Sequence, residues 1–150
     1  MIQHRQHGQA LVFLTAVLPL FLAVIGLALD GGHLFAERAD LQAIADASAR
    51  AGAVRLDTAR MYREGTGVVF LSPDDAASAA RDYASYHGLT ADQIDTNADD
   101  QLVTVQLHQD VPTVFVRVVR IDTVTIRASS TASARYGVDR PLNGLSHGPD

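Results

Sequence analysis

The feature that most constrains this chain is an uncharged stretch close to its start. No charged side chain occurs from Gln9 to Leu29, and Ala10–Leu29 is a run of 20 residues that is almost entirely apolar. At about 1.5 Å of rise per residue, a helix of this length spans about 30 Å, which is the thickness of the hydrocarbon core of a bilayer. The stretch therefore predicts a transmembrane helix over residues 9–29, preceded by a short cytoplasmic leader at residues 1–8.

Pro19 is the interior position that conflicts with a straight helix. Its ring removes one backbone donor and so frees the carbonyl of Thr15, one turn earlier. A threonine hydroxyl can help to satisfy such a loosened turn in a membrane helix, and we therefore expect a gentle kink at Pro19. Small residues in the same span leave flat surfaces on which another helix can pack closely. They are Ala16, Ala23, Gly26 and Ala28.

A cleaved secretion signal is the main alternative for this stretch. Arg5 could serve as its basic region, and Gly26-Leu27-Ala28 fits a small-x-small cleavage site. However, the apolar run is longer than the roughly 7 to 15 residues of a signal core, and no polar segment separates it from that site. The sequence favours a retained anchor, with the basic N-terminal flank in the cytoplasm and the chain from Asp30 onward outside.

The segment that follows the apolar run is also expected to be helical. Residues 30–62 are rich in alanine, leucine and other helix formers, and they contain no proline. Gly31-Gly32 weakens the junction by on the order of 1 kcal/mol per glycine and is a candidate hinge at the membrane surface. We predict one long helix, half in lipid and half outside, bent or straight at these glycines.

Residues 63–136 have the pattern of a small extracytoplasmic domain. Ser72-Pro73 followed by two aspartates predicts a helix start, and that helix would end near His87 and Gly88. Residues 102–107 and 123–134 alternate between apolar and polar side chains, which predicts two half-buried strands. Residues 90–100 are expected to form an acidic loop, residues 112–121 suit either a short helix or a strand, and residues 137–150 are expected to form a loose tail.

These elements together predict an α+β fold. A long N-terminal transmembrane helix continues into an alanine-rich extracytoplasmic helix, which is followed by a helix and a small antiparallel sheet.

Composition and motifs give little support for catalysis or for nucleic-acid binding. The net charge is −5, with 12 arginines, no lysine and 17 acidic residues, so no basic excess is available to hold nucleic acid. Cysteine is absent, which excludes thiol chemistry and disulfides. Residues 144–148 match a nucleophile elbow without the partners that follow one, and residues 95–99 match only half of a calcium loop. We therefore predict no enzyme activity, no cofactor and no metal site.

Three polar residues follow the apolar run at helical spacing. Asp30, His33 and Glu37 are expected on one face of the helix, just outside the membrane. Such a trio could ligate a metal ion or meet lipid headgroups, and solvation of a juxtamembrane helix face is the commoner explanation.

The order of these features resembles a known family. Gly8 ends a polar leader, Gln9-Ala10-Leu11-Val12-Phe13 opens the apolar run, Gly26-Leu27-Ala28-Leu29-Asp30 closes it, and residues 41–53 read LQAIADASARAGA. This order resembles the TadE/TadG-like proteins of the Flp (tight adherence, Tad) pilus-assembly system, most closely the TadG-like N-terminal segment. The resemblance covers about residues 5–56.

The resemblance also implies a candidate prepilin-type processing site between Gly8 and Gln9. TadE-like members resemble type IV prepilins, which are cut after a leader glycine and carry a glutamate five residues beyond the cut. Here the fifth residue after Gly8 is Phe13, so the resemblance favours an unprocessed, TadG-like accessory protein.

Family resemblance implies a single-pass protein of the bacterial cytoplasmic membrane that serves Flp pilus assembly or secretion. The resemblance also implies that the α+β fold has a pilin-like arrangement. The protein would act as an accessory or minor-pilin-like component, through helix packing and protein–protein contacts. Its expected partners are the lipid bilayer, TadE-like proteins, pilin, the membrane platform and further copies of itself. The alternatives are a generic membrane-anchored extracytoplasmic binding domain and a domain secreted after signal cleavage.

Overall fold

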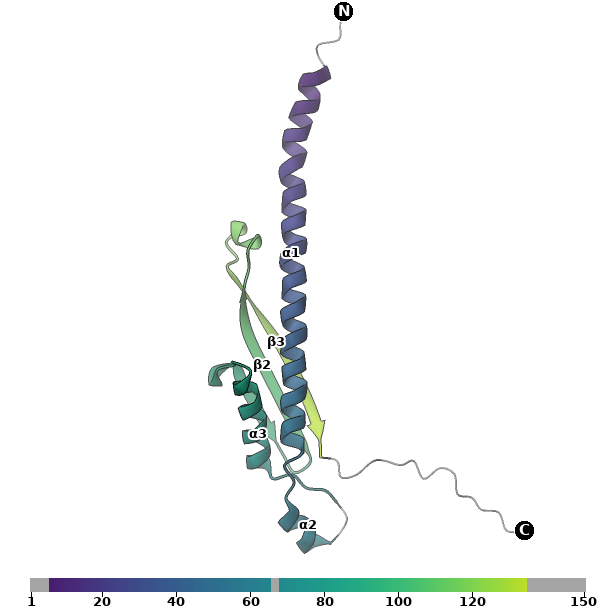
Figure 1. Cartoon of the computed structure of the whole chain (residues 1–150), viewed down its shortest axis with the longest axis vertical. Helices are drawn as coiled ribbons and strands as arrows, with labels where there is room; N and C mark the ends of the chain where they lie inside the picture. Colours follow the sequence, from purple (N-terminus) through teal and green to yellow (C-terminus); the bar gives the residue numbers. More distant parts are fainter. Residues whose placement is uncertain (1–5, 66–67, 135–150) are drawn as a thin grey trace, which may run out of the picture.

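The computed structural model describes residues 6–65 and 68–134. It contains one long helix, two shorter helices and a three-stranded antiparallel sheet, and the predicted α+β class is confirmed (Figure 1). The helices are α1 (Gln6–Ala53), α2 (Thr58–Glu64) and α3 (Pro73–Tyr86). The strands are β1 (Ile94–Ala98), β2 (Leu102–Pro112) and β3 (Thr123–Ser133), with short 3₁₀ turns at Ala91–Gln93 and Val116–Val119.

α1 is a single helix of 48 residues. It runs through Gly31-Gly32 without interruption, so these glycines do not break the helix. The helix ends at Ala53 instead of continuing to residue 62 as expected. The reason is that Leu56 forms a bridge with Leu71 and Asp57 caps a separate helix by accepting a hydrogen bond from the backbone N–H of Arg60 at 2.9 Å.

The limits of α3 agree with the sequence-based prediction. Pro73 opens the helix and Asp74 and Asp75 lie in its first turn, where they face the positive end of the helix dipole. The Ser72 hydroxyl donates to the Asp75 carboxylate at 2.8 Å instead of capping a backbone N–H. Gly88 follows the helix with a φ of 88°, a conformation that favours glycine.

The sheet has the order β1-β2-β3, and both pairings are antiparallel. β2 and β3 confirm the two predicted strands, and the β2 side chains Val103, Val105 and Leu107 point into the core. β1 was not predicted, because its Asp and Asn content favours a loop. Pairing with β2 overrides this tendency, since buried Ile94 lies opposite Leu107 and starts a ladder that continues to Ala98.

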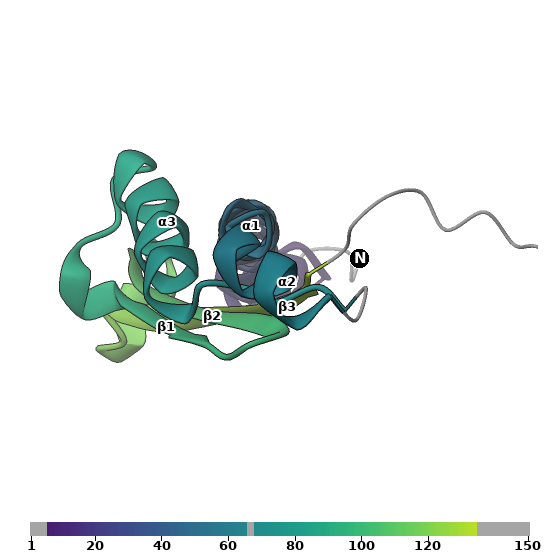
Figure 2. The same ribbon diagram turned by 90° about the horizontal axis from the view of Figure 1, so that it is seen from below.

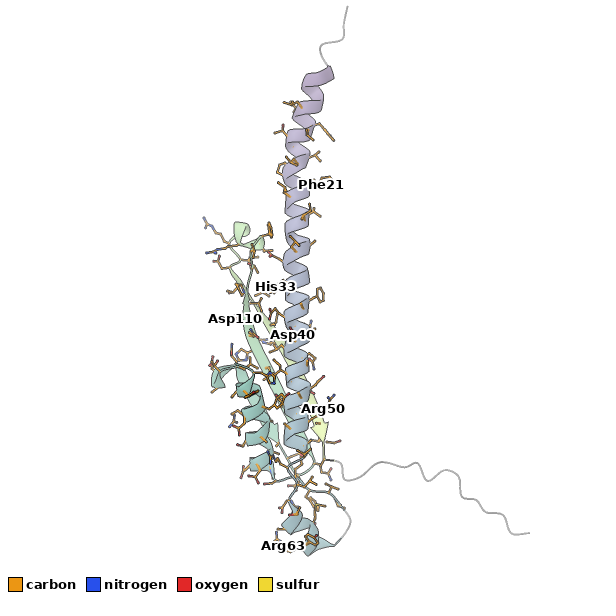
Figure 3. The ribbon with its side chains drawn as sticks, viewed as in Figure 1. Phe21, His33, Asp40, Arg50, Arg63 and Asp110 are labelled. Carbon is orange, nitrogen blue, oxygen red and sulfur yellow. The ribbon has the colours of Figure 1, made fainter. Side chains whose placement is uncertain are left out.

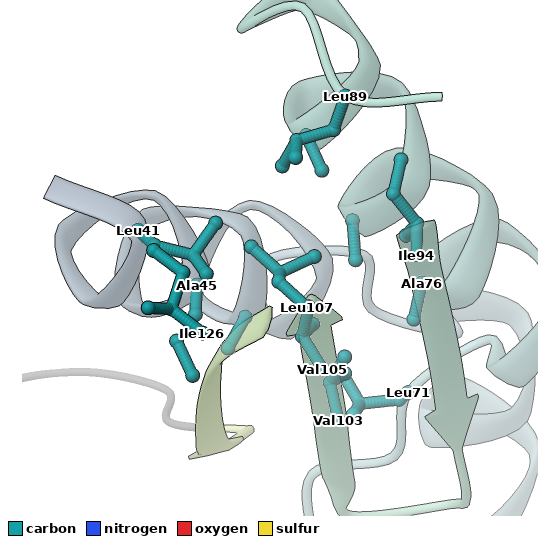
Figure 4. Close-up of a cluster of buried hydrophobic side chains, with 14 of the residues drawn as sticks. Leu41, Ala45, Leu71, Ala76, Leu89, Ile94, Val103, Val105, Leu107 and Ile126 are labelled. Carbon is teal, nitrogen blue, oxygen red and sulfur yellow. The ribbon is translucent and has the colours of Figure 1, made fainter. Parts of the chain in front are cut away.

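The core lies between one face of the sheet and the two helices α1 and α3, which Figure 2 shows side by side on that face. Alanine supplies much of the helical contribution, so the helices approach the sheet closely. Larger side chains come mainly from β2 and from Leu41 and Leu71, as Figure 4 shows. The buried alanines of the helices are Ala45, Ala49, Ala53, Ala76, Ala80 and Ala84.

The first half of α1 projects beyond this domain. Figure 3 shows Phe21 on that projecting part, where the described side chains are apolar and mostly exposed. Phe21 is 63% exposed and Phe13 is 71% exposed. By length and composition, this is the one described helix that could cross a membrane, and a signal sequence near an N-terminus has the same character.

Candidate functional site

The strongest candidate site is the contact between α1 and the connection from β2 to β3. We call this connection, Thr113–Asp122, the hairpin tip. Figure 1 shows the hairpin tip in light green beside α1, beyond the ends of the two long strands. The contact joins the end of the apolar run of α1, together with Asp30 directly after it, to the connection between the last two strands.

Asp30 holds the hairpin tip through three backbone hydrogen bonds. Its Oδ2 atom accepts from the N–H groups of Phe115 and Val116, each at 2.8 Å, and its Oδ1 atom accepts from the N–H of Val114 at 3.2 Å. The Asp30 residue is only 5% exposed. A buried carboxylate is costly unless its oxygens are hydrogen-bonded, so the chain supplies donors from a segment more than 80 positions away.

The charge state of Asp30 follows from this environment. The hydrogen bond from Val116 has the largest effect and lowers the pKa of the Asp30 carboxyl below its ordinary value. Burial opposes that effect, while the bonds from Val114 and Phe115 and the neighbouring His33 add to the lowering. Asp30 is therefore ionised at neutral pH, and its negative charge lies against three converging N–H dipoles.

The hairpin tip also satisfies its own polar groups. The N–H of buried Thr113 donates to the carbonyl of Asp122 at 3.0 Å, and its hydroxyl donates to the carbonyl of Ile121. The N–H of Arg120, a residue with a φ of 65°, donates to the carbonyl of Arg117 at 2.9 Å. These bonds close the chain into a compact turn that Asp30 can hold at one end.

Phe115 packs against α1 at Gly26, one turn before Asp30. A Cβ atom added at Gly26 would lie 2.6 Å from the Phe115 ring, well inside van der Waals contact. Glycine at this position therefore permits the ring to lie on the helix backbone. Gly26 was predicted to leave a flat surface for another helix, and in the structure that surface is covered by a side chain of the same protein.

The other two residues of the predicted polar face take no part in holding the hairpin tip. The Nδ1 atom of His33 lies 3.9 Å from Oε1 of Glu37, and both side chains remain substantially exposed. Figure 3 marks His33 on the part of α1 that runs beside β2 and β3. Asp30 thus differs from this pair in being buried and engaged with the hairpin tip.

The structure says less about the remaining predicted sites. Gly8 and Gln9 lie within the helical backbone of α1, and the predicted processing between them stays a prediction. Pro19 also lies inside α1, and nearby the Thr15 hydroxyl donates to the Leu11 carbonyl at 2.7 Å. The expected kink at Pro19 remains a prediction as well.

Sequence reasoning missed the partners of Asp30. One signal for them was present, because an acid directly after an apolar run needs a partner or water. The other half of the contact consists of backbone N–H groups, which no residue pattern reveals. The described residues hold no group of three or more His, Cys, Asp or Glu side chains placed to bind a metal ion. The site is therefore a contact within the chain that holds the hairpin tip against α1.

Residues 8–55 match the family model Tad, described as Flp pilus-assembly TadE/G-like. The resemblance predicted from the sequence is confirmed over these residues, which include Gly26 and Asp30. No curated protein and no solved structure matches the chain.

Proposed function

Because residues 8–55 match the TadE/G-like model, we propose that this protein is a single-pass membrane component of a Flp/Tad-type pilus-assembly or secretion system. It serves as an accessory or minor-pilin-like subunit and acts by helix packing and protein–protein contacts. Its N-terminus lies in the cytoplasm and residues 30 onward lie outside. Its partners are other proteins of the pilus-assembly machinery.

The observation that carries this proposal is the continuity of α1. One helix contains both the exposed apolar half and the half that forms the domain core, with Leu41 buried and Phe13 exposed. An apolar helix that continues without interruption into the helix packed on the sheet could carry the domain at a fixed position beside other subunits, and this supports the proposal.

The contacts of the hairpin tip favour retention of the apolar half. Signal cleavage near Leu29 would remove Gly26, the surface on which Phe115 packs. It would also leave Asp30 at or beside a new, charged N-terminus, next to the N–H groups that it binds. A secreted domain produced by this cleavage would therefore lack one of the contacts that position the hairpin tip.

An uncovered face of α1 supports association with other helices. Phe35 is 76% exposed although it lies beside the core-forming part of the helix. Ala39 and Ala43 follow at spacing four and are also exposed, so a neighbouring helix could approach closely and bury the ring.

N-terminal sequencing of the mature protein tests the anchor directly. A start at Met1 means an intact anchor, and a start at Gln9 means prepilin-type processing that keeps the anchor. A start near Leu29 would overturn the proposed membrane role in favour of a secreted domain.

A photo-crosslinking amino acid at Phe35 tests the partner class, with Tyr62 as the matched control. Tyr62 is 90% exposed and lies on α2, away from the uncovered face of α1. We expect crosslinks from position 35 to pilus-assembly proteins and few from position 62. Deletion of the gene should reduce surface pili, and an unchanged pilus number together with no crosslinks would leave only a generic anchored domain.

A further inference from the structure

The hairpin tip presents apolar side chains that the domain does not cover. Val114 is 69% exposed, and Phe115 and Ile121 are each 46% exposed. They lie together on one short connection, at the end of the sheet nearest to the apolar half of α1 (Figure 1). Three large apolar residues gathered at one tip of a small domain indicate a surface that contacts something other than water.

The position of the hairpin tip along α1 identifies what that surface meets. Phe115 lies on Gly26, which is three residues before the end of the predicted span at Leu29. At 1.5 Å per residue this contact lies about 4.5 Å inside that end. If residues 9–29 fill a hydrocarbon core of about 30 Å, the hairpin tip lies at the outer boundary between acyl chains and headgroups.

We propose that the hairpin tip is a second membrane contact, inserted into the outer face of the same bilayer that α1 crosses. This inference rests on the proposed anchoring of α1. Val114, Phe115 and Ile121 enter the boundary region, while the exposed side chains of Arg117 and Arg120 lie at the level of the phosphates. Interfacial segments elsewhere combine apolar and arginine side chains in this way.

The hydrogen bonding of the hairpin tip fits this environment. Backbone groups that reach the acyl-chain side of this boundary lose their contact with water and must find partners within the protein. Three consecutive N–H groups at Val114–Val116 bind Asp30, and the polar groups of Thr113 are paired with Ile121 and Asp122. Arg117 forms an ion pair with Asp122 at 3.1 Å, and both side chains are largely exposed.

Tryptophan fluorescence tests the inference, because the chain contains no tryptophan. Single variants Val114→Trp, Phe13→Trp and Tyr86→Trp of the full chain would be reconstituted into phosphatidylethanolamine–phosphatidylglycerol vesicles. Position 13 lies in the apolar half of α1, and Tyr86 is 87% exposed at the end of α3. Lipids brominated near the headgroup or deep in the acyl chain would serve as quenchers.

We expect Val114→Trp to emit at shorter wavelength than Tyr86→Trp and to lose most of its emission with the shallow quencher. If Phe13→Trp is quenched but Val114→Trp behaves like Tyr86→Trp, the anchor stands and the inserted hairpin tip is wrong. If Phe13→Trp is not quenched either, the proposed anchoring fails and the inference fails with it. Emission from position 114 that is blue-shifted, insensitive to both quenchers and dependent on protein density would assign the surface to a second copy of the chain and overturn the membrane contact.

Discussion

Gly52 offers a direct test of how closely α1, α3 and β2 pack. A Cβ atom at this buried position would lie 2.7 Å from the carbonyl oxygen of Ala76 and 3.0 Å from a methyl carbon of Val103. The carbonyl belongs to the backbone of α3, so Gly52→Ala forces the two helices apart. At Gly32, by contrast, an added Cβ meets nothing within 4 Å.

The two substitutions share one chemical change and differ in the clash. Alanine gains up to about 1 kcal/mol of helix propensity over glycine in either variant, and overpacking of a tight core typically costs about 1–3 kcal/mol. Because the propensity gain is common to both, the difference between the variants isolates the clash. We expect Gly52→Ala to be less stable than Gly32→Ala by about 1–3 kcal/mol, which corresponds to an about 5- to 150-fold difference in the unfolding equilibrium.

Hydrogen exchange of the β2 amides measures this difference in the full chain in detergent micelles, because the most protected strand reports the unfolding of the core. The amides of Gly52→Ala should exchange faster than those of the wild type, and those of Gly32→Ala should exchange at the wild-type rate or more slowly. Equal protection in the two variants would refute the close contact between Gly52 and the Ala76 carbonyl.

Four further perturbations test other contacts. Ser48 is fully buried and its Oγ atom has no hydrogen-bond partner in the described part of the chain. Ser48→Ala should therefore raise the free energy of unfolding, measured with guanidinium, by about 1 kcal/mol. A lower free energy of unfolding would mean that the hydroxyl is paired. Asp30→Asn should abolish much of the exchange protection of the Val114–Val116 amides and leave that of β2 intact, whereas equal loss in both would indicate a general role in stability. The pKa of Asp30 lies below its ordinary value of 3.8 in the folded protein. The stability that ionised Asp30 contributes is therefore complete above that value and is lost as the pH falls through the lower folded pKa. NMR of the same amides at decreasing pH should show their release in the wild type and no such transition in Asp30→Asn. Gly26→Ala should displace the Phe115 ring and weaken the same protection, and wild-type protection in this variant would contradict the ring-on-backbone contact.

The sequence predicted those elements whose signals are local. An uncharged run, a Ser-Pro helix start and strict alternation in residues 102–107 are each visible within a few positions, and each corresponds to α1, α3 or β2. The end of α1 was predicted too late, because Val54–Asp57 contains no strong helix breaker. It is the bridge between Leu56 and Leu71, a tertiary contact, that ends the helix there.

Features that depend on distant partners could not be predicted in this way. The residues of β1 become a strand because β2 lies beside them, although their own preference is for a loop. Asp30 was predicted to lie on a polar helix face just outside the membrane, but its role in the structure depends on the backbone of Val114–Val116, whose N–H groups carry no sequence signature. The Asp30 side of the candidate site could therefore be predicted from the sequence, and the backbone side could not.

The contact of Gly26 and Asp30 with the hairpin tip also fixes the rotational position of the domain around the axis of α1. Because the domain is held to α1 at this level and again along the core near Leu41, it cannot swivel around the helix axis. Each face of the apolar half therefore has a constant orientation relative to the domain. A partner that binds one side of the apolar half will consequently always meet the same side of the domain.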